Sequence, residues 1–164
     1  MKGTALPSLS PQDERLLVAA IGLAQRARGN GNHPFGALLA APSGDVLCEA
    51  ENTVVTSGDV TGHAELNLVS KACRALTAGQ LATATLYTST EPCAMCSGAI
   101  YWSRIVRVVF ALGEDELAVL AGGGGAFLLQ LPSRQVFAAG STAVEVSGPH
   151  LRDAAAAVHQ DFWT

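Results

Sequence analysis

The chain carries little charge, and its basic residues form no surplus. Charged residues make up 15% of the 164 positions, and ten Lys and Arg side chains against fourteen Asp and Glu give a formal net charge of −4. The basic residues are scattered and form no stripe. Because binding to a polynucleotide depends mainly on basic groups that contact phosphates, nucleic acid is an unfavoured partner.

Long hydrophobic runs are also missing. No apolar stretch approaches the roughly 20 residues of a membrane-spanning helix, and residues 1–11 lack the charged start and apolar segment of a secretory signal. We therefore expect a cytoplasmic protein without membrane contact. Apolar residues make up 49% of the chain, which excludes a disordered chain. The length suits a single domain over 1–164.

Only four cysteines are present, and two of them are spaced as a functional pair. Cys93 and Cys96 are separated by two residues, which in an intracellular chain favours a metal-binding or redox role over disulfides. Cys48 and Cys73 have no such partner. We expect both to be buried packing residues.

The spacing of apolar residues predicts helices that alternate with strands. The sequence SPQD at 10–13 is typical of a helix start, and PSGD at 42–45 of a hairpin turn. Helices are expected at 11–28, 63–76, 93–102, 114–121 and 151–162, and strands at 37–41, 46–52, 86–89, 105–111 and 144–147. This order indicates an α/β protein with a partly parallel sheet.

The sequence reads HAE at 63–65 and PCAMC at 92–96, which together fit the H-x-E and P-C-x-x-C signature of zinc-dependent nucleobase deaminases. In a first helical turn, Cys93 and Cys96 face one side and can bind one ion. His63 would be a third ligand, leaving the fourth tetrahedral position for water, as in catalytic zinc sites. Glu65 is the candidate for proton transfer.

His63 and Glu65 are two residues apart and so do not share a helix face. His63 must therefore lie at the start of its helix, where Gly62 suits a turn. A redox role for the cysteines would leave both residues unexplained. A closed structural zinc site would need a fourth ligand, which no other histidine supplies at a recognisable spacing; the others are His33, His150 and His159.

Several phrases resemble the cytidine deaminase superfamily, most closely its bacterial guanine deaminase and nucleoside deaminase branch. They are NHPFGA at 32–37, ENTVV at 51–55, HAE at 63–65, TSTEPCAMC at 88–96 and AIYW at 99–102. The resemblance implies a three-layer α/β/α fold with a central mixed five-stranded sheet. It also implies one bound zinc ion per chain and a homodimer.

By the same resemblance, Asn52 would hydrogen-bond the substrate, while Phe35, Gly36 and Ala37 would form a pocket wall. Trp102, which ends the last matching phrase, is a further candidate for substrate binding. Asn52 could instead merely end a strand, and Phe35 could belong to the ordinary core.

The segment 113–164 departs from the family pattern. Residues 122–127 read GGGGAF, where related deaminases often carry an acidic, proline-containing loop near the substrate, so no acid in this loop can read a guanine edge. Phe162 and Trp163 are large aromatics at an end where chains commonly fray. We expect them to help close an active site, either their own or, in a swapped dimer, that of the partner. Docking on their own domain is the alternative.

The expected reaction is hydrolytic deamination of a small amino-heterocycle, with guanine as the first candidate and xanthine plus ammonia as products. Guanosine, cytosine, cytidine, adenine and ammeline remain open. A tRNA adenosine deaminase shares the zinc motif but should present basic groups, and residues 151–164 contain one Arg, two Asp and no Lys. A non-catalytic zinc-stabilised interaction module would have no use for Glu65.

Overall fold

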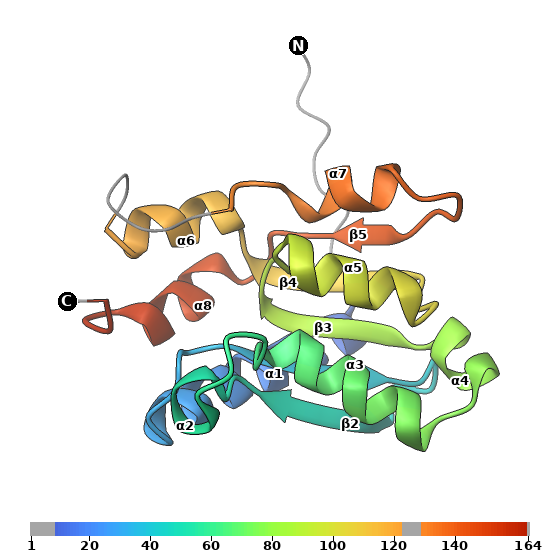
Figure 1. The fold of residues 1–164 in the computed structure, drawn as a ribbon, viewed down its shortest axis with the longest axis horizontal. Helices are drawn as coiled ribbons and strands as arrows, with labels where there is room; N and C mark the ends of the chain where they lie inside the picture. Colours follow the sequence, from blue (N-terminus) through green and yellow to red (C-terminus); the bar gives the residue numbers. More distant parts are fainter. Residues whose placement is uncertain (1–8, 123–128, 164) are drawn as a thin grey trace, which may run out of the picture.

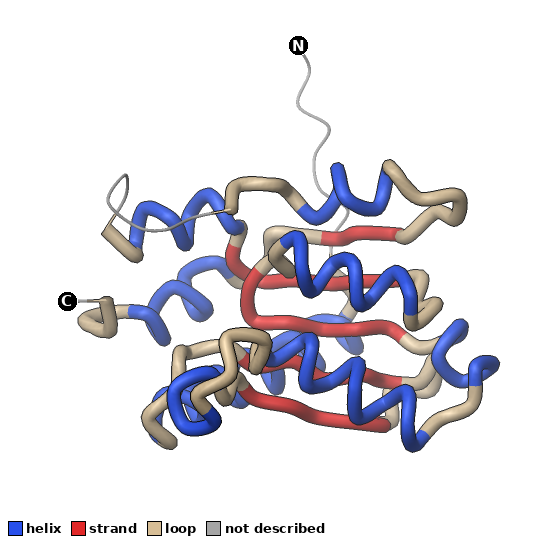
Figure 2. The backbone as a smooth tube through the Cα atoms, in the orientation of Figure 1, coloured by secondary structure: helices blue, strands red, loops and turns tan. Residues whose placement is uncertain are grey.

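The computed structural model describes residues 9–122 and 129–163. Within these residues five strands form one sheet in the order β2-β1-β3-β4-β5 (Figure 2). Strand β1 pairs antiparallel with β2 and β3, whereas β3, β4 and β5 run parallel. The strands are β1 (Gly36–Ala40), β2 (Val46–Glu51), β3 (Thr85–Thr90), β4 (Arg107–Leu112) and β5 (Glu145–Ser147). The expected mixed five-stranded sheet is confirmed.

Helices cover both faces of the sheet and give three layers (Figure 1). One face packs against α1 (Pro11–Gly29) and α8 (Arg152–His159), and the other against α3 (Ala64–Ala75) and α5 (Ala94–Trp102). The remaining helices are α2 (Val54–Ser57), α4 (Ala78–Thr83), α6 (Glu114–Leu120) and α7 (Ser133–Ala138). Among the described helices, none combines the length and apolarity needed to cross a membrane.

The sheet divides the hydrophobic core into two parts. Successive strand residues point to opposite faces, so Leu38 packs with Leu16 of α1 on one side, whereas Leu39 packs with Leu68 of α3 on the other. All these side chains are fully buried. Coverage on both faces explains why β1 and β4 are apolar along most of their length.

A buried ionic contact fastens α1 to the sheet. The Asp13 carboxylate accepts hydrogen bonds from the Arg107 guanidinium of β4 at 2.9 and 3.0 Å, and from the Tyr87 hydroxyl of β3 at 2.6 Å. The hydrogen bonds from Arg107 dominate and hold the pKa of Asp13 at about 2. Burial, together with the bond to Asp13, raises the pKa of Tyr87 to about 12.

The structure corrects one expectation about the cysteines. Cys48 is buried as expected, but Cys73 is exposed, so the prediction for Cys73 is wrong. Helix α3 begins directly after His63, which turns Glu65, Leu68, Val69 and Ala72 toward the interior. These positions follow helical spacing, and Cys73 falls on the outer face.

The short helices α2, α4 and α7 were not anticipated from the sequence. Each has at most six residues, too short for a clear apolar periodicity. Of the predicted oligoglycine loop, Gly122 has a left-handed φ of 98°, and residues 123–125 lie outside the described part of the chain.

Candidate active site

Two helix N-termini meet beside the edge of the sheet where β3 and β4 end (Figure 1). His63 is the N-cap residue of α3 and Cys93 that of α5, and both have extended backbone angles. The prediction that His63 lies at the helix start is thus confirmed. Gly62 serves close packing here, because a Cβ atom would lie 2.7 Å from Thr53 Oγ1. Parallel strands commonly place ligand sites at their carboxyl ends.

The three candidate ligands come together in a geometry that suits zinc. His63 Nδ1 lies 3.6 Å from Cys93 Sγ and 3.6 Å from Cys96 Sγ, and all ligand atoms lie within 4.8 Å of one another. Zinc–sulfur bonds of about 2.3 Å and a zinc–nitrogen bond of about 2.0 Å, at a tetrahedral angle, place nitrogen and sulfur about 3.5 Å apart, close to the observed distances. The donor set therefore fits zinc with one coordination position left for another group.

The pKa values of Cys93 and Cys96 are shifted in opposite directions. Hydrogen bonding from Cys96 is the main cause that lowers the pKa of Cys93 to about 4, and His63 contributes in the same direction. The Cys93 contact and burial raise the pKa of Cys96. Cys93 is therefore the cysteine that loses its proton more easily, and a metal ion bound by both would require both as thiolates, because a ligating cysteine is deprotonated.

Glu65 lies in the first turn of α3, beside these ligands. Its side chain is buried, and the Thr88 hydroxyl donates a hydrogen bond to Oε1 at 2.6 Å. Burial raises the pKa of Glu65. A carboxylate with increased proton affinity can take up and release protons during a reaction near neutral pH.

A small cavity of about 80 Å³ opens beside these residues. His63, Cys93 and Glu65 line one part of it, and Phe35 and Leu117 add apolar surface. Phe35 therefore occupies the place expected of a pocket wall. The cavity is also lined by Thr90, Glu91 and Glu114, none of which the sequence singled out.

Asn52 is held rigidly next to Phe35. Its backbone N–H donates to the Phe35 carbonyl at 3.0 Å, and its side-chain Oδ1 accepts from Val54 N–H at 3.0 Å. The side chain is buried, and no described residue accepts a hydrogen bond from Nδ2. A buried donor without a partner is uncommon. Asn52 is not among the residues that line the small cavity, so its contact with a substrate stays a prediction.

Three other expected substrate contacts lie elsewhere in this chain. A Cβ atom on Gly36 would lie 2.4 Å from Ala24 N, so Gly36 permits close packing of β1 on α1. Ala37 is fully buried in the core beneath α3. Trp102 lies at the far end of α5 from Cys93 and is 83% exposed. None of the three lines the small cavity beside His63, Cys93 and Glu65, which we call the catalytic cavity.

The terminal aromatic residues pack on their own chain. Trp163 stacks on His159 with ring centroids 6.0 Å apart, and its ring lies 6.2 Å from that of Phe35. Phe162 meets His33 edge-on at 6.0 Å. Burial lowers the pKa of His159 to about 4. Because Phe35 lines the cavity, this tail supports a cavity wall in cis, and exchange between subunits stays a prediction.

Thr90 and Glu114 reach the cavity through non-local structure. Thr90 shares a face of β3 with Thr88, two residues earlier, and that face is turned toward α3 and α5. Glu114 begins α6 directly after β4, whose end lies beside the end of β3. The sequence held one signal for Glu114: it is a polar residue that comes shortly after a buried strand, at the end of the strand where ligand sites are common.

Comparison with known proteins agrees with this geometry. The model of the cytidine and deoxycytidylate deaminase zinc-binding region matches residues 10–112. A probable cytosine deaminase of Schizosaccharomyces pombe is 43% identical over 156 residues, 94% of each chain. The guanine deaminase of Bacillus subtilis is 46% identical over 95 residues, 58% of this chain and 60% of that protein. Relatives also include tRNA-specific adenosine deaminases.

Among solved structures, the guanine deaminase from Nitrosomonas europaea superposes with a TM-score of 0.76 at 24% identity, covering 94% of this chain and 85% of that one. This likeness supports the three-layer fold. The matched zinc-binding region contains all three candidate ligands as well as Glu65. The chain therefore belongs to the cytidine and deoxycytidylate deaminase family and is a zinc-binding hydrolytic deaminase.

Proposed function

We propose that this protein deaminates a free one-ring base, with cytosine as the leading candidate. The observation that carries the proposal is the catalytic cavity, about 80 Å³ in volume. A cavity of about 150 Å³ accommodates benzene, and the cavity beside Glu65 is smaller, so a purine would require a larger widening of the site than a single ring. The match to a probable cytosine deaminase along 94% of both chains supports the same choice.

In the proposed site His63, Cys93 and Cys96 hold the zinc ion. Zinc, when bound there, activates water as a nucleophile at neutral pH. Glu65 takes a proton from the attacking water and delivers it to the ring nitrogen, then transfers a second proton to the amino group, which leaves as ammonia. One water is consumed, and a C–O bond replaces the C–N bond.

The remaining residues orient the ring. Asn52 Nδ2 donates a hydrogen bond to a substrate carbonyl, which satisfies the amide left without a partner. Phe35 forms an apolar wall, backed by Trp163. Thr88 holds the Glu65 carboxyl group in place through its 2.6 Å hydrogen bond.

Ammonia release from the zinc protein tests this proposal. We expect cytosine to react faster than guanine, adenine, ammeline and the nucleosides cytidine, guanosine and adenosine. Faster release from guanine would reject the one-ring assignment. Zinc retention without release from any of these compounds would favour the non-catalytic interaction module.

Guanine is the second candidate, and a specific feature favours it. A second cavity of about 570 Å³ adjoins the catalytic cavity at Glu91 and Glu114. If Glu114 turned aside, the second ring of a purine could extend toward the larger cavity. The 46% identity to the Bacillus subtilis guanine deaminase over 95 residues also fits this choice.

We further propose that the active form is a homodimer, as the family resemblance implies. Exposed Trp102 and its T-shaped neighbour Tyr101, with ring centroids 5.7 Å apart, provide apolar surface at the end of α5. Sedimentation equilibrium of the zinc protein should give twice the mass of 16.8 kDa. A mass of one chain at all concentrations would reject the dimer.

A further inference from the structure

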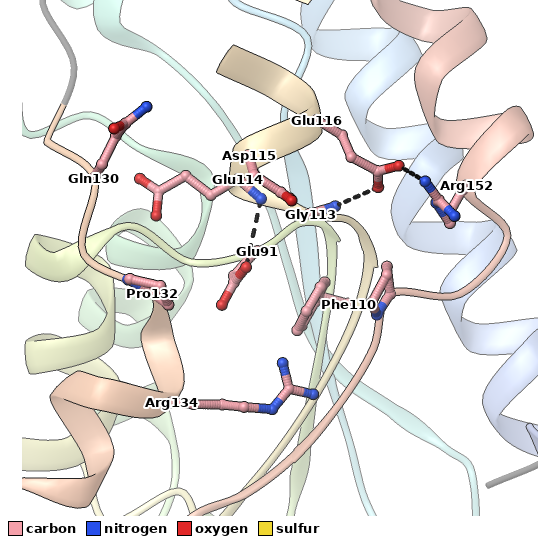
Figure 3. A pocket seen from close by; sticks show the side chains of 11 residues that line it. Glu91, Phe110, Gly113, Glu114, Asp115, Glu116, Gln130, Pro132, Arg134 and Arg152 are labelled. Carbon is pink, nitrogen blue, oxygen red and sulfur yellow. Dashed lines mark hydrogen bonds and ion pairs between the residues drawn. The ribbon is translucent and has the colours of Figure 1, made fainter. Parts of the chain in front are cut away.

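Two cavities meet beside the catalytic centre. The larger one lies between the ends of β3 and β4, the start of α6, and α7 (Figure 3). It shares two acidic residues with the catalytic cavity, namely Glu91 and Glu114. These two side chains therefore lie at the boundary, but their surroundings differ.

The Glu91 carboxylate is fully engaged within the protein. Oε1 accepts hydrogen bonds from Ser133 N–H at 3.0 Å and from the Ser133 hydroxyl at 2.6 Å. Oε2 accepts from the backbone N–H of Glu114 at 3.4 Å (Figure 3). Glu91 thus connects the end of β3 to the starts of α6 and α7, and its role is structural.

The Glu114 carboxyl group has no such partners. Its side chain is half-buried, and no donor among residues 9–122 and 129–163 hydrogen-bonds to it. Burial is the main cause that raises the pKa of Glu114 to about 7, followed by the charge of Glu91. A partly buried carboxyl group gains most from a ligand that donates hydrogen bonds to it.

Thr90 supplies a second polar group without a partner in the same cavity. It is 3% exposed, and no described residue hydrogen-bonds to its Oγ1. The Thr90 carbonyl lies 3.0 Å from the Thr88 hydroxyl, whose shorter hydrogen bond goes to Glu65. Buried hydroxyl groups nearly always have a partner, so this one is suited to contact a bound molecule.

We propose that Glu114 and Thr90 form a specificity-determining wall, in which Glu114 accepts a hydrogen bond from an N–H group of the substrate and the Thr90 hydroxyl contacts the same ring. The inference rests on the proposed deaminase function and narrows its substrates to heterocycles with an N–H group on the edge that faces α6. An acid at the start of α6 thereby provides the contact that the sequence GGGGAF at 122–127 cannot.

The test couples protein variants to methylated substrates. The variant Glu114→Gln keeps the size of the side chain, and Thr90→Val removes only the hydroxyl group. Asp115→Asn is the matched control, because Asp115 is exposed in the same helical turn and does not line the catalytic cavity. Thr90→Ser should restore the contact. The substrates are cytosine, N1-methylcytosine and N4-methylcytosine, each methyl group replacing one N–H.

We expect Glu114→Gln to lower kcat/KM for cytosine about 10- to 100-fold, mainly through KM, as a charge-assisted hydrogen bond is lost. Thr90→Val should cost about 3- to 10-fold. The preference for cytosine over one of the methylated bases should fall about tenfold in Glu114→Gln and persist in Asp115→Asn. Such coupling identifies a direct contact, which a general loss of stability would not imitate.

Binding separates this inference from the proposed reaction. In a Glu65→Gln background, which should not turn over, calorimetry measures cytosine affinity with and without Glu114→Gln. If Glu114→Gln weakens cytosine binding but the parent protein releases no ammonia, the proposed reaction is rejected and the proposed contact between Glu114 and the substrate is kept. If Glu114→Gln changes neither the cytosine affinity nor the preference for cytosine over either methylated base, the proposed contact is rejected, whether or not the parent protein releases ammonia.

Discussion

At the scale of single residues, the chemistry is concentrated at two helix starts. His63 and Glu65 begin α3, and Cys93 and Cys96 begin α5. Backbone N–H groups at a helix N-terminus favour negative charge, which makes it easier for Cys93 and Cys96 to lose their protons. Of these four side chains, those of His63, Glu65 and Cys93 line the catalytic cavity.

We predict that a Cys93→Ala, Cys96→Ala double variant loses zinc, because only His63 would remain of the three ligands. Metal analysis after gel filtration checks this. Cys73→Ala is the matched control, since Cys73 is a free and exposed cysteine, and it should retain about one zinc ion per chain. Full zinc occupancy in the double variant would refute the ligand assignment.

We predict that Glu65→Gln retains zinc and its unfolding temperature but loses activity about 10²- to 10⁴-fold, the usual contribution of general acid–base catalysis. The loss should appear in kcat. Glu49→Gln, an exposed change of the same kind on β2, should leave the rate unchanged. Turnover near the parent rate would mean that another group moves the protons.

The metal ligands and Glu65 could be predicted from the sequence because their spacing is local and chemically specific. Thr90 and Glu114 were missed, since their position beside the metal ligands depends on the pairing of β3 with β4, and only the place of Glu114 shortly after a buried strand gave a signal. The structure gives Gly36 a packing role for a related reason, and its contact with a substrate stays a prediction. Its lack of a side chain serves the contact with α1, and that contact lies on the other face of the sheet.

At the scale of elements, α1 is held by a charge that the sequence did not reveal. Asp13 was predicted only as part of a helix start, and Ser10 does cap α1. The contacts of Asp13 with Tyr87 and Arg107 join residues 74 and 94 positions apart in the sequence. No local sequence pattern could predict them. Long apolar helices and strands were predictable, whereas α7 depends on burying Phe137 in the core.

We predict that Asp13→Asn lowers the free energy of unfolding by about 2 kcal/mol at pH 7. The folded pKa of about 2 lies below the unfolded value near 3.8, so the stabilisation is present above pH 4 and is lost as the pH falls through 2. Urea titrations at pH 7 and pH 2 check this. Glu14→Gln, exposed in the same turn, should show little effect at either pH.

We predict that deleting residues 162–164 impairs turnover more than folding or zinc binding. Trp163 packs against Phe35, and loss of this support would admit water to the cavity. The checks are steady-state kinetics, thermal unfolding and metal content of the shortened chain. Unchanged kinetics would show that the tail is packing only.

At the scale of the whole molecule, His63 and Cys93 are 30 residues apart. A zinc ion held between them therefore closes a loop that contains α3, α4 and β3, and acts as a removable cross-link. Because the ion binds the native state, its free energy of binding adds to that of folding. Treatment with a strong chelator should lower the unfolding temperature of the parent protein and of Glu65→Gln alike.

This cross-link also predicts where the molecule loosens. Removal of zinc leaves Asp13 and Arg107 paired on the opposite face of the sheet, so α1 should keep its slow amide hydrogen exchange. Faster exchange should be confined to the first turns of α3 and α5, where the ligands are attached. A metal-free protein with faster exchange throughout would instead mean that the ion holds the entire fold together.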